Sequence, residues 1–288
     1  MEFLAPADWA EALQAKAAHP DAVPIAGGTD VMVELNFDLR RPTALLDLGR
    51  VAELRDWDAS EGAVRLGAAV TFARLLHPDL ADRLPALAMA ARTVGSPQIR
   101  NRATVGGNLG TASPAGDAHP VLLATGAVVE AESVRGVRPI PIGDFFTGVK
   151  RSALAPDELI RAVSIPTAAG PQQFAKVGSR NAMVIAVCSL SLALDTGRRV
   201  VGTGIGSAGP TPLTAPAAQD FLADELDWDR LTVSAGAAEH FGRLLGQAAN
   251  PIDDVRGTAA YRRHALAVLA VRTLRWMSRT GKSEQVAA

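Results

Sequence analysis

The sequence predicts an α+β protein built from three consecutive units: a small α/β unit over residues 1–55, a mixed α+β unit over residues 56–170, and a C-terminal unit over residues 171–288 with a small antiparallel sheet and helices. Short apolar strands flank a glycine turn and a helical segment near the start, both element types are mixed in the middle, and strand candidates precede helical stretches at the end. The 288 residues suffice for two or three modest domains.

The first unit begins with a helix. Asp8 is a favourable N-cap residue, Glu11 three positions later completes a capping box, and the pair His19-Pro20 ends the helix. The further elements are a strand at 22–25, a glycine turn at 26–30, a helix near 31–35 and a buried strand at 44–48. This order predicts a small α/β unit.

The second unit mixes strands and helices. A polar stretch at 97–102 is interpreted as a basic loop, and a second glycine-containing loop at 104–117 leads to a helix that begins at Asp117. The expected strands are 64–68, 127–131, 138–142 and 159–165, and the expected helices are 72–76, 84–94 and 117–123.

The third unit separates its strands from its helices. Strands are expected at 174–177, 183–194 and 200–205, and helices at 215–222, 231–247 and 258–279. The last stretch has apolar residues at helical spacing with arginines opposite, which is typical of an amphipathic helix. Strands followed by helices predict an α+β module.

Composition excludes several classes of function. The formal net charge is -1 and no block of lysines and arginines occurs, so nothing favours binding to nucleic acid or to an anionic membrane. With Cys188 as its only cysteine, the chain alone holds neither an iron–sulfur cluster nor a cysteine zinc site. We expect a cytoplasmic protein, because the N-terminus lacks a signal-peptide pattern and the longest apolar run, 183–194, is too short to span a bilayer.

Two glycine pairs are the strongest candidates for binding chemistry. Gly27-Gly28 and Gly106-Gly107 are each flanked by small or β-branched residues, and a short polar side chain follows each pair. Glycine permits a positive φ and a close approach of ligand to main chain. Convergent amide N–H groups, or the N-terminus of a following helix, attract an anion. Two such loops together can enclose the two phosphates of a dinucleotide.

Each feature also has a simpler interpretation. A Gly-Gly pair alone is more often an ordinary turn, and neither pair has the Gly-x-Gly-x-x-Gly pattern of the common dinucleotide fold. Asp117 alone is explained as a helix N-cap, and Lys176 alone as a solvated strand lysine. The combination of two glycine pairs with the small, polar stretch 104–117 favours a nucleotide cofactor.

The residues around these pairs resemble a known family. Segments 26–30 (Ala-Gly-Gly-Thr-Asp) and 104–108 (Thr-Val-Gly-Gly-Asn) are similar to the two FAD-binding loops of the flavoprotein subunits of molybdenum hydroxylases. The similarity covers essentially the whole chain and includes residues 96–101, 111–114 and 253–257. The family contains xanthine, carbon monoxide and aromatic hydroxylating enzymes, and the likeness is greatest to the bacterial xanthine dehydrogenase type, whose three cofactors lie on separate chains.

The resemblance implies a set of FAD-binding residues but no catalytic residue and no metal ligand. The main chain of the two loops would contact the diphosphate, and Thr111 and Asp117 would hydrogen-bond the flavin or its ribityl and phosphate arm. Ile160 would pack against the isoalloxazine, and Lys176 would lie at the flavin edge. Some relatives carry His-Ser in place of Thr29-Asp30, so only backbone contacts carry over there. The complete set is Ala26, Gly27, Gly28, Thr29, Asp30, Val105, Gly106, Gly107, Asn108, Thr111, Asp117, Ile160 and Lys176.

The resemblance also implies a role in electron transfer. FAD in this chain would take electrons from the [2Fe-2S] clusters of a small partner subunit, which receives them from the molybdenum cofactor of a large partner subunit, and would pass them to NAD+. Three alternatives stay open: the flavin subunit of a carbon monoxide or aromatic/aldehyde hydroxylase, a non-catalytic assembly protein that lost FAD, and a self-sufficient flavin enzyme. For the last, His119 is the candidate base.

Overall fold

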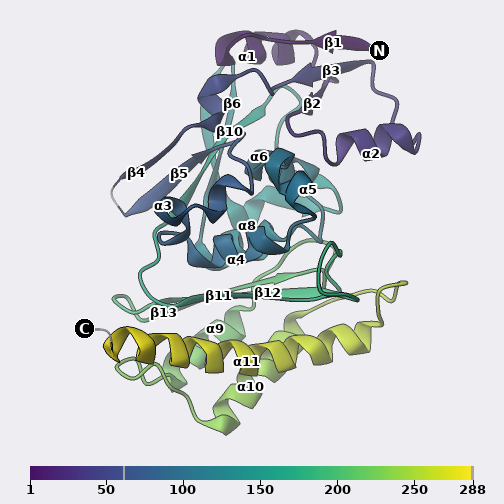
Figure 1. The fold of residues 1–288 in the computed structure, drawn as a ribbon. Coiled ribbons are helices and arrows are strands. Elements are labelled where there is room, and N and C mark those ends of the chain that lie inside the picture. Colours follow the sequence, from purple (N-terminus) through teal and green to yellow (C-terminus); the bar gives the residue numbers. More distant parts are fainter. Residues whose placement is uncertain (61, 287–288) are drawn as a thin grey trace.

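The computed structural model describes residues 1–60 and 62–286. Figure 1 shows the N-terminal unit at the top, the central unit below it, and the C-terminal sheet with its helices at the bottom. The sheets follow the chain order: one of three strands, one of five strands and another of three strands, with an additional two-stranded hairpin in the central unit.

The first unit is a three-stranded parallel sheet with two helices. Strand β3 lies between β1 and β2 and runs parallel to both. The predicted N-cap is present, because Asp8 Oδ1 accepts a hydrogen bond from the Glu11 N–H at 2.9 Å. The elements are β1 (Glu2–Leu4), α1 (Trp9–Ala18), β2 (Val23–Ile25), α2 (Val31–Asn36) and β3 (Ala44–Asp47).

The second unit is a five-stranded antiparallel sheet in the order β4-β5-β10-β6-β7, and short helices accompany it. The strands are β4 (Trp57–Ser60), β5 (Ala63–Gly67), β6 (Val128–Ser133), β7 (Gly136–Pro141) and β10 (Leu159–Pro166), with the hairpin β8 (Phe146–Gly148) and β9 (Arg151–Ser152). The helices are η1 (Ala52–Arg55), η2 (Arg74–Leu76), α3 (Pro78–Ala81), α4 (Pro85–Thr93), α5 (Pro97–Arg102), α6 (Val105–Thr111), α7 (Ala118–Thr125) and α8 (Ile142–Phe145).

Two segments that the sequence predicted as loops are helices. In α5, Ser96 is the N-cap and its Oγ accepts from the Ile99 N–H at 3.3 Å, while Pro97 occupies the first helical position. In α6, Thr104 is the N-cap and its Oγ1 accepts from the Gly107 N–H at 3.0 Å. The second glycine pair therefore lies inside the first turn of a helix, and the prediction of a loop there was wrong.

The third unit is an antiparallel sheet in the order β11-β12-β13 followed by three helices, as predicted. The strand expected at 183–194 begins only at Cys188, and Met183, at the start of the expected range, has a φ of 50°, outside the β region. The elements are β11 (Gln172–Val177), β12 (Cys188–Asp195), β13 (Val200–Gly206), α9 (Pro216–Glu225), α10 (Ala235–Ala248) and α11 (Ala259–Val286).

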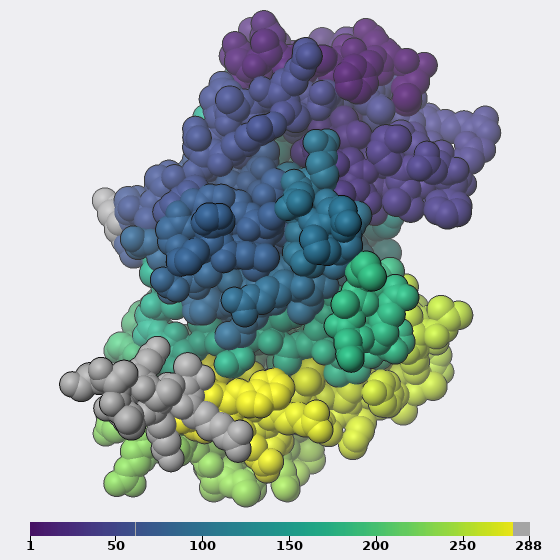
Figure 2. Space-filling model, viewed as in Figure 1, coloured from purple at the N-terminus to yellow at the C-terminus, as the bar shows by residue number. Residues whose placement is uncertain are grey.

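The buried apolar side chains form two cores. One is shared by the first two units and includes Phe174 from the third, and the other lies within the third unit. The space-filling view shows the units in chain order from top to bottom (Figure 2). None of the helices in the described residues is long and apolar enough to cross a membrane.

Candidate functional site

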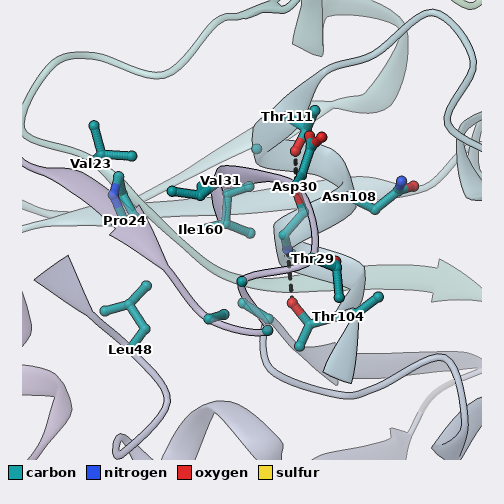
Figure 3. Close-up of a pocket in the computed structure, with 18 of the residues that line it drawn as sticks. Val23, Pro24, Thr29, Asp30, Val31, Leu48, Thr104, Asn108, Thr111 and Ile160 are labelled. Atoms are coloured by element: carbon teal, nitrogen blue, oxygen red, sulfur yellow. Dashed lines mark hydrogen bonds between the residues drawn. The ribbon is translucent and has the colours of Figure 1, made fainter. Parts of the chain in front are cut away.

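A cavity of about 670 Å³ lies between the first and second units, and both glycine pairs line it. Ligand pockets typically have volumes of roughly 300–1,000 Å³. Figure 3 shows β2 and the turn that follows it facing α6 across this space, with the side chains of Thr29, Asp30, Asn108 and Ile160 around it. The predicted site residues in its lining are Ala26, Gly27, Gly28, Thr29, Asp30, Gly106, Gly107, Asn108, Thr111 and Ile160.

The first glycine pair leaves main-chain donors unused. Gly28 has a φ of 75°, and a Cβ on Gly27 would lie only 1.9 Å from the carbonyl oxygen of Arg102, so both positions require glycine. In the described part of the chain, the main-chain N–H groups of residues 27–30 donate no hydrogen bond. Because a buried or half-buried N–H needs an acceptor, these four groups form a cradle suited to an anion.

The second glycine pair has a different role from the one expected. Its main-chain N–H groups are already used: Val105 donates to Val70 O at 3.0 Å, Gly106 to Ala68 O at 2.9 Å, and Gly107 to the Thr104 hydroxyl. The Asn108 N–H donates to the Thr104 carbonyl at 2.9 Å. The main chain of residues 105–108 is thus not a second cradle of free N–H groups.

The side chains on α6 leave a polar group available to a ligand. Asn108 Oδ1 is buried and has no hydrogen-bond partner among the described residues. Such orphaned atoms are rare in folded proteins, and this one belongs to a residue that lines the cavity. Thr111, one turn later, donates its hydroxyl proton to Gly107 O at 3.0 Å (Figure 3). The free N–H groups of residues 27–30 suit the phosphates of a cofactor, and the amide oxygen of Asn108 in the same cavity suits a hydroxyl or N–H donor.

Two predicted site residues lie outside the cavity lining and form a buried ion pair. Lys176 Nζ on β11 is 2.6 Å from Asp117 Oδ2 at the start of α7, and both side chains are less than a tenth exposed. The pair also binds Thr93, through the Thr93 carbonyl and hydroxyl. Burial raises the pKa of Asp117 above its ordinary value, although Lys176 and the Thr93 hydroxyl oppose the rise. Asp117 Oδ1 remains unpaired among the described residues.

His119 is unsuited to act as a base for a substrate. The ring is completely buried, and its nitrogens lie 3.0 Å from Ser113 O and 3.1 Å from Asn108 O. Burial lowers the pKa of His119 to about 4, against the effect of both carbonyls. The ring therefore stays neutral and structural, which removes the sequence-based support for a self-sufficient flavin enzyme.

Sequence reasoning missed several cavity residues. Lys16 is buried at the end of α1, and its Nζ donates to the carbonyls of Pro20 and Ala22, each at 2.7 Å. Burial lowers its pKa. Glu34, Lys150 and, from the third unit, Ile185 also line the cavity. No motif marks these positions, because the tertiary fold brings them to the cavity. Val105, by contrast, is a predicted residue that is wholly buried in the core.

Two protein families match this chain. The family described as the FAD binding domain in molybdopterin dehydrogenase matches residues 1–168, and the CO dehydrogenase flavoprotein C-terminal domain matches residues 173–277. Together they cover nearly all of the chain. The chain belongs to the FAD-binding subunits of the molybdenum hydroxylases. FAD is accordingly the cofactor of this flavoprotein subunit, and the alternative of an assembly protein without FAD is set aside.

Individual relatives agree with this assignment. The flavoprotein subunit is 36% identical to the nicotinate dehydrogenase FAD-subunit of Eubacterium barkeri, over 77% of this chain and 79% of that protein. It is 37% identical to the xanthine dehydrogenase FAD-binding subunit of Escherichia coli O157:H7, over 71% and 73%. Among solved structures, quinoline 2-oxidoreductase from Pseudomonas putida 86 has a chain with a TM-score of 0.88 and 27% identity, covering 97% of each chain.

Proposed function

We propose that the cavity between the first two units is the FAD site, and that the subunit passes electrons from an iron–sulfur partner to NAD+ in a complex of the xanthine dehydrogenase type. The observation that carries the site is the set of unused N–H groups at residues 27–30 in a cavity that Asn108, with its unpaired Oδ1, also lines. The xanthine assignment rests on the 37% identity to a xanthine dehydrogenase FAD-binding subunit.

The residues of this chain bind and orient the cofactor. The N–H groups of residues 27–30 hold the diphosphate, and the N-terminus of α6 adds its positive dipole end. Asn108 and Thr111 hydrogen-bond the polar arm, and Ile160 packs against the ring system. The buried pair of Lys176 and Asp117 fixes β11 against α7. As part of this proposal, Lys176 would supply a cation at the flavin edge. We also propose that the boundaries between the three units lie at residues 55 and 170.

FAD, when bound, supplies the two-electron chemistry that connects one-electron iron–sulfur clusters to a hydride acceptor. The partners we propose are a large subunit with the molybdenum cofactor and a small subunit with [2Fe-2S] clusters. A partner is required because Cys188, the only cysteine, is buried and burial raises its pKa to about 12, so this chain supplies no cluster ligands. NAD+ is proposed as acceptor by the resemblance to xanthine dehydrogenases.

A nicotinate-type complex is the second candidate. The nicotinate dehydrogenase relative is 36% identical and is matched over a slightly larger share of both chains than the xanthine relative. Nicotinate and xanthine both contain a nitrogen heterocycle, and we propose that the residues that select between them belong to the large partner subunit.

Absorbance and reduction experiments test the proposal in order. The purified subunit should show flavin bands near one equivalent, identified as FAD by mass, and anaerobic NADH should bleach them. A colourless protein that refuses added FAD would overturn the site, and FAD that NADH leaves oxidised would overturn the acceptor. In the native complex, xanthine should bleach the flavin faster than nicotinate, and the reverse order would favour the second candidate.

A further inference from the structure

One ion pair crosses the cavity between the first and second units. Lys150 Nζ, in the loop between β8 and β9, donates to Glu34 Oε1 on α2 at 2.6 Å, and both residues line the cavity. Lys150 is held in place by its main chain, because it has a φ of 52° and its N–H donates to Ala112 O at the end of α6. The pair therefore links α2 to the helix that carries the second glycine pair.

Few other interactions hold α2 in place. None of its residues is buried, and a helix of one or two turns has little stability of its own. Figure 1 shows α2 projecting from the side of the molecule. Among the residues that the structure describes, Glu34–Lys150 is the one ion pair between α2 and the second unit.

The opposite side of the first unit is anchored more firmly. Trp9 on α1 is 5% exposed, and its Nε1 donates to Glu132 Oε2 on β6 at 2.8 Å. The Arg161 guanidinium lies over the Trp9 ring, 5.0 Å from its centre. The first unit is thus fixed to the five-stranded sheet through α1. At α2, on the other side of the cavity, the Glu34–Lys150 ion pair makes the connection to the second unit.

We propose that Glu34 and Lys150 form a clasp that slows the release of FAD. This inference rests on the proposal that the cavity is the FAD site. A cofactor held between the two units leaves when α2 moves away from α6, and that movement breaks the ion pair. The clasp is formed at neutral pH, since Lys150 and Arg40, the latter 3.7 Å from Glu34 Oε2, keep the carboxylate ionised.

The rate of FAD release from the intact subunit tests the clasp. The holoprotein is diluted, and the rise in flavin fluorescence is followed as FAD enters solution. Because partly exposed ion pairs are weak, Glu34→Gln and Lys150→Met should each speed release by roughly two- to fivefold. The double variant should release FAD no faster than either single variant, since each change removes the same interaction. Arg41→Met is the matched control, because Arg41 pairs with Asp38 on the same segment and does not line the cavity.

The possible outcomes separate the clasp from the proposed function. A wild-type subunit that never binds FAD would overturn the FAD site itself. If the wild type binds FAD and Lys150→Met releases it at the wild-type rate, the clasp is wrong. Single effects that multiply in the double variant would also overturn the clasp, because Lys150 would then act on FAD independently of Glu34. If Arg41→Met speeds FAD release as much as Lys150→Met does, the effect comes from the loss of a positive charge in general, and the clasp is wrong.

Discussion

The four glycines at the cavity serve different physical needs. Gly27 makes room for the main chain of Arg102, and Gly28 adopts a positive φ. A Cβ on Gly106 would lie 2.5 Å from Ala68 Cβ and 2.7 Å from Ala68 O, so this glycine allows α6 to pack against the segment after β5. Gly107 is the exposed one of these four glycines, and a Cβ there would meet only the Thr104 hydroxyl, at 2.9 Å. The sequence presents two similar pairs, but only the structure distinguishes these roles.

Gly107→Val should abolish FAD binding and leave the fold intact. The added side chain occupies cavity space, while the expected cost in stability is limited to a weakened N-cap, about 1 kcal/mol. Circular dichroism and flavin content report the two effects separately. Gly106→Ala should instead destabilise the protein by roughly 1–3 kcal/mol through overpacking. Stoichiometric FAD in a folded Gly107→Val protein would contradict the assigned role of this helix end.

His119 should make the protein sensitive to moderate acid. Its folded-state pKa of about 4 lies below the ordinary value of 6.5, so the unfolded state binds more protons between these values. Stability is therefore fully present above pH 6.5 and is lost as the pH falls toward 4. Between pH 7 and pH 5 the loss from this residue is about 2 kcal/mol. Urea unfolding of the wild type and His119→Gln at both pH values measures it, and equal pH dependence in the two proteins would contradict it.

At the scale of elements, the long periodic segments were predictable and the short ones were not. The N-cap at Asp8 and the strand-then-helix order after residue 171 were predicted correctly. The capping box was only half correct, because Glu11 Oε2 accepts from the Ala7 N–H instead of the Asp8 N–H. Helix α5 carries a Ser-Pro start signal that its basic composition obscured, and α6 contains three glycines that argue against a helix. Tertiary contacts stabilise the start of α6, because its first N–H groups donate to the carbonyls of Val70 and Ala68, more than thirty residues earlier in the chain.

The candidate site was also only partly predictable from the sequence. Residues 26–30 and 106–108 line the cavity, as their motifs predicted. The sequence could indicate them because glycines and small polar residues are typical of backbone segments that a ligand approaches closely. The sequence does not show which N–H groups remain unused, since that depends on acceptors in other elements. Lys16 and Lys150 were missed for a related reason: only the packing of α1 and the turn at Lys150 bring them to the cavity.

The ion pair between β11 and α7 should contribute strongly to stability. Lys176→Met leaves the Asp117 carboxylate buried without its cation, and breaking a buried pair in this way costs about 3–5 kcal/mol. Pairing Lys176→Met with Asp117→Asn should recover part of that loss, because the amide carries no charge. Chemical denaturation of both proteins measures the difference. A Lys176→Met protein as stable as the wild type would show that Asp117 finds another partner or takes up a proton at little cost.

At the scale of the whole molecule, the third unit depends on the second for one face of its sheet. Alternate residues Gly202, Gly204 and Gly206 of β13 face α7, and Cβ atoms there would lie 1.9 Å from Ala124 O, 1.8 Å from Pro120 O and 2.7 Å from Pro120 Cγ. The backbone of the helix thus packs directly on the strand. The sequence order suggested separate units, whereas this glycine stripe, spaced as the two-residue period of a strand requires, joins them.

Gly204→Ala should uncouple the third unit from the rest. The Cβ cannot fit between β13 and Pro120, so α7 must move away from the sheet, at an expected cost of about 3 kcal/mol. Because α7 starts at Asp117, the same movement strains the ion pair of Asp117 with Lys176 and should raise the dissociation constant for FAD.

Gly236→Ala is the matched control: a Cβ there meets nothing within 4 Å, and alanine favours helix α10. Calorimetry should show a single unfolding transition for wild type and Gly236→Ala and two for Gly204→Ala. A single, unshifted transition in Gly204→Ala would show that the sheet and α7 separate without cost.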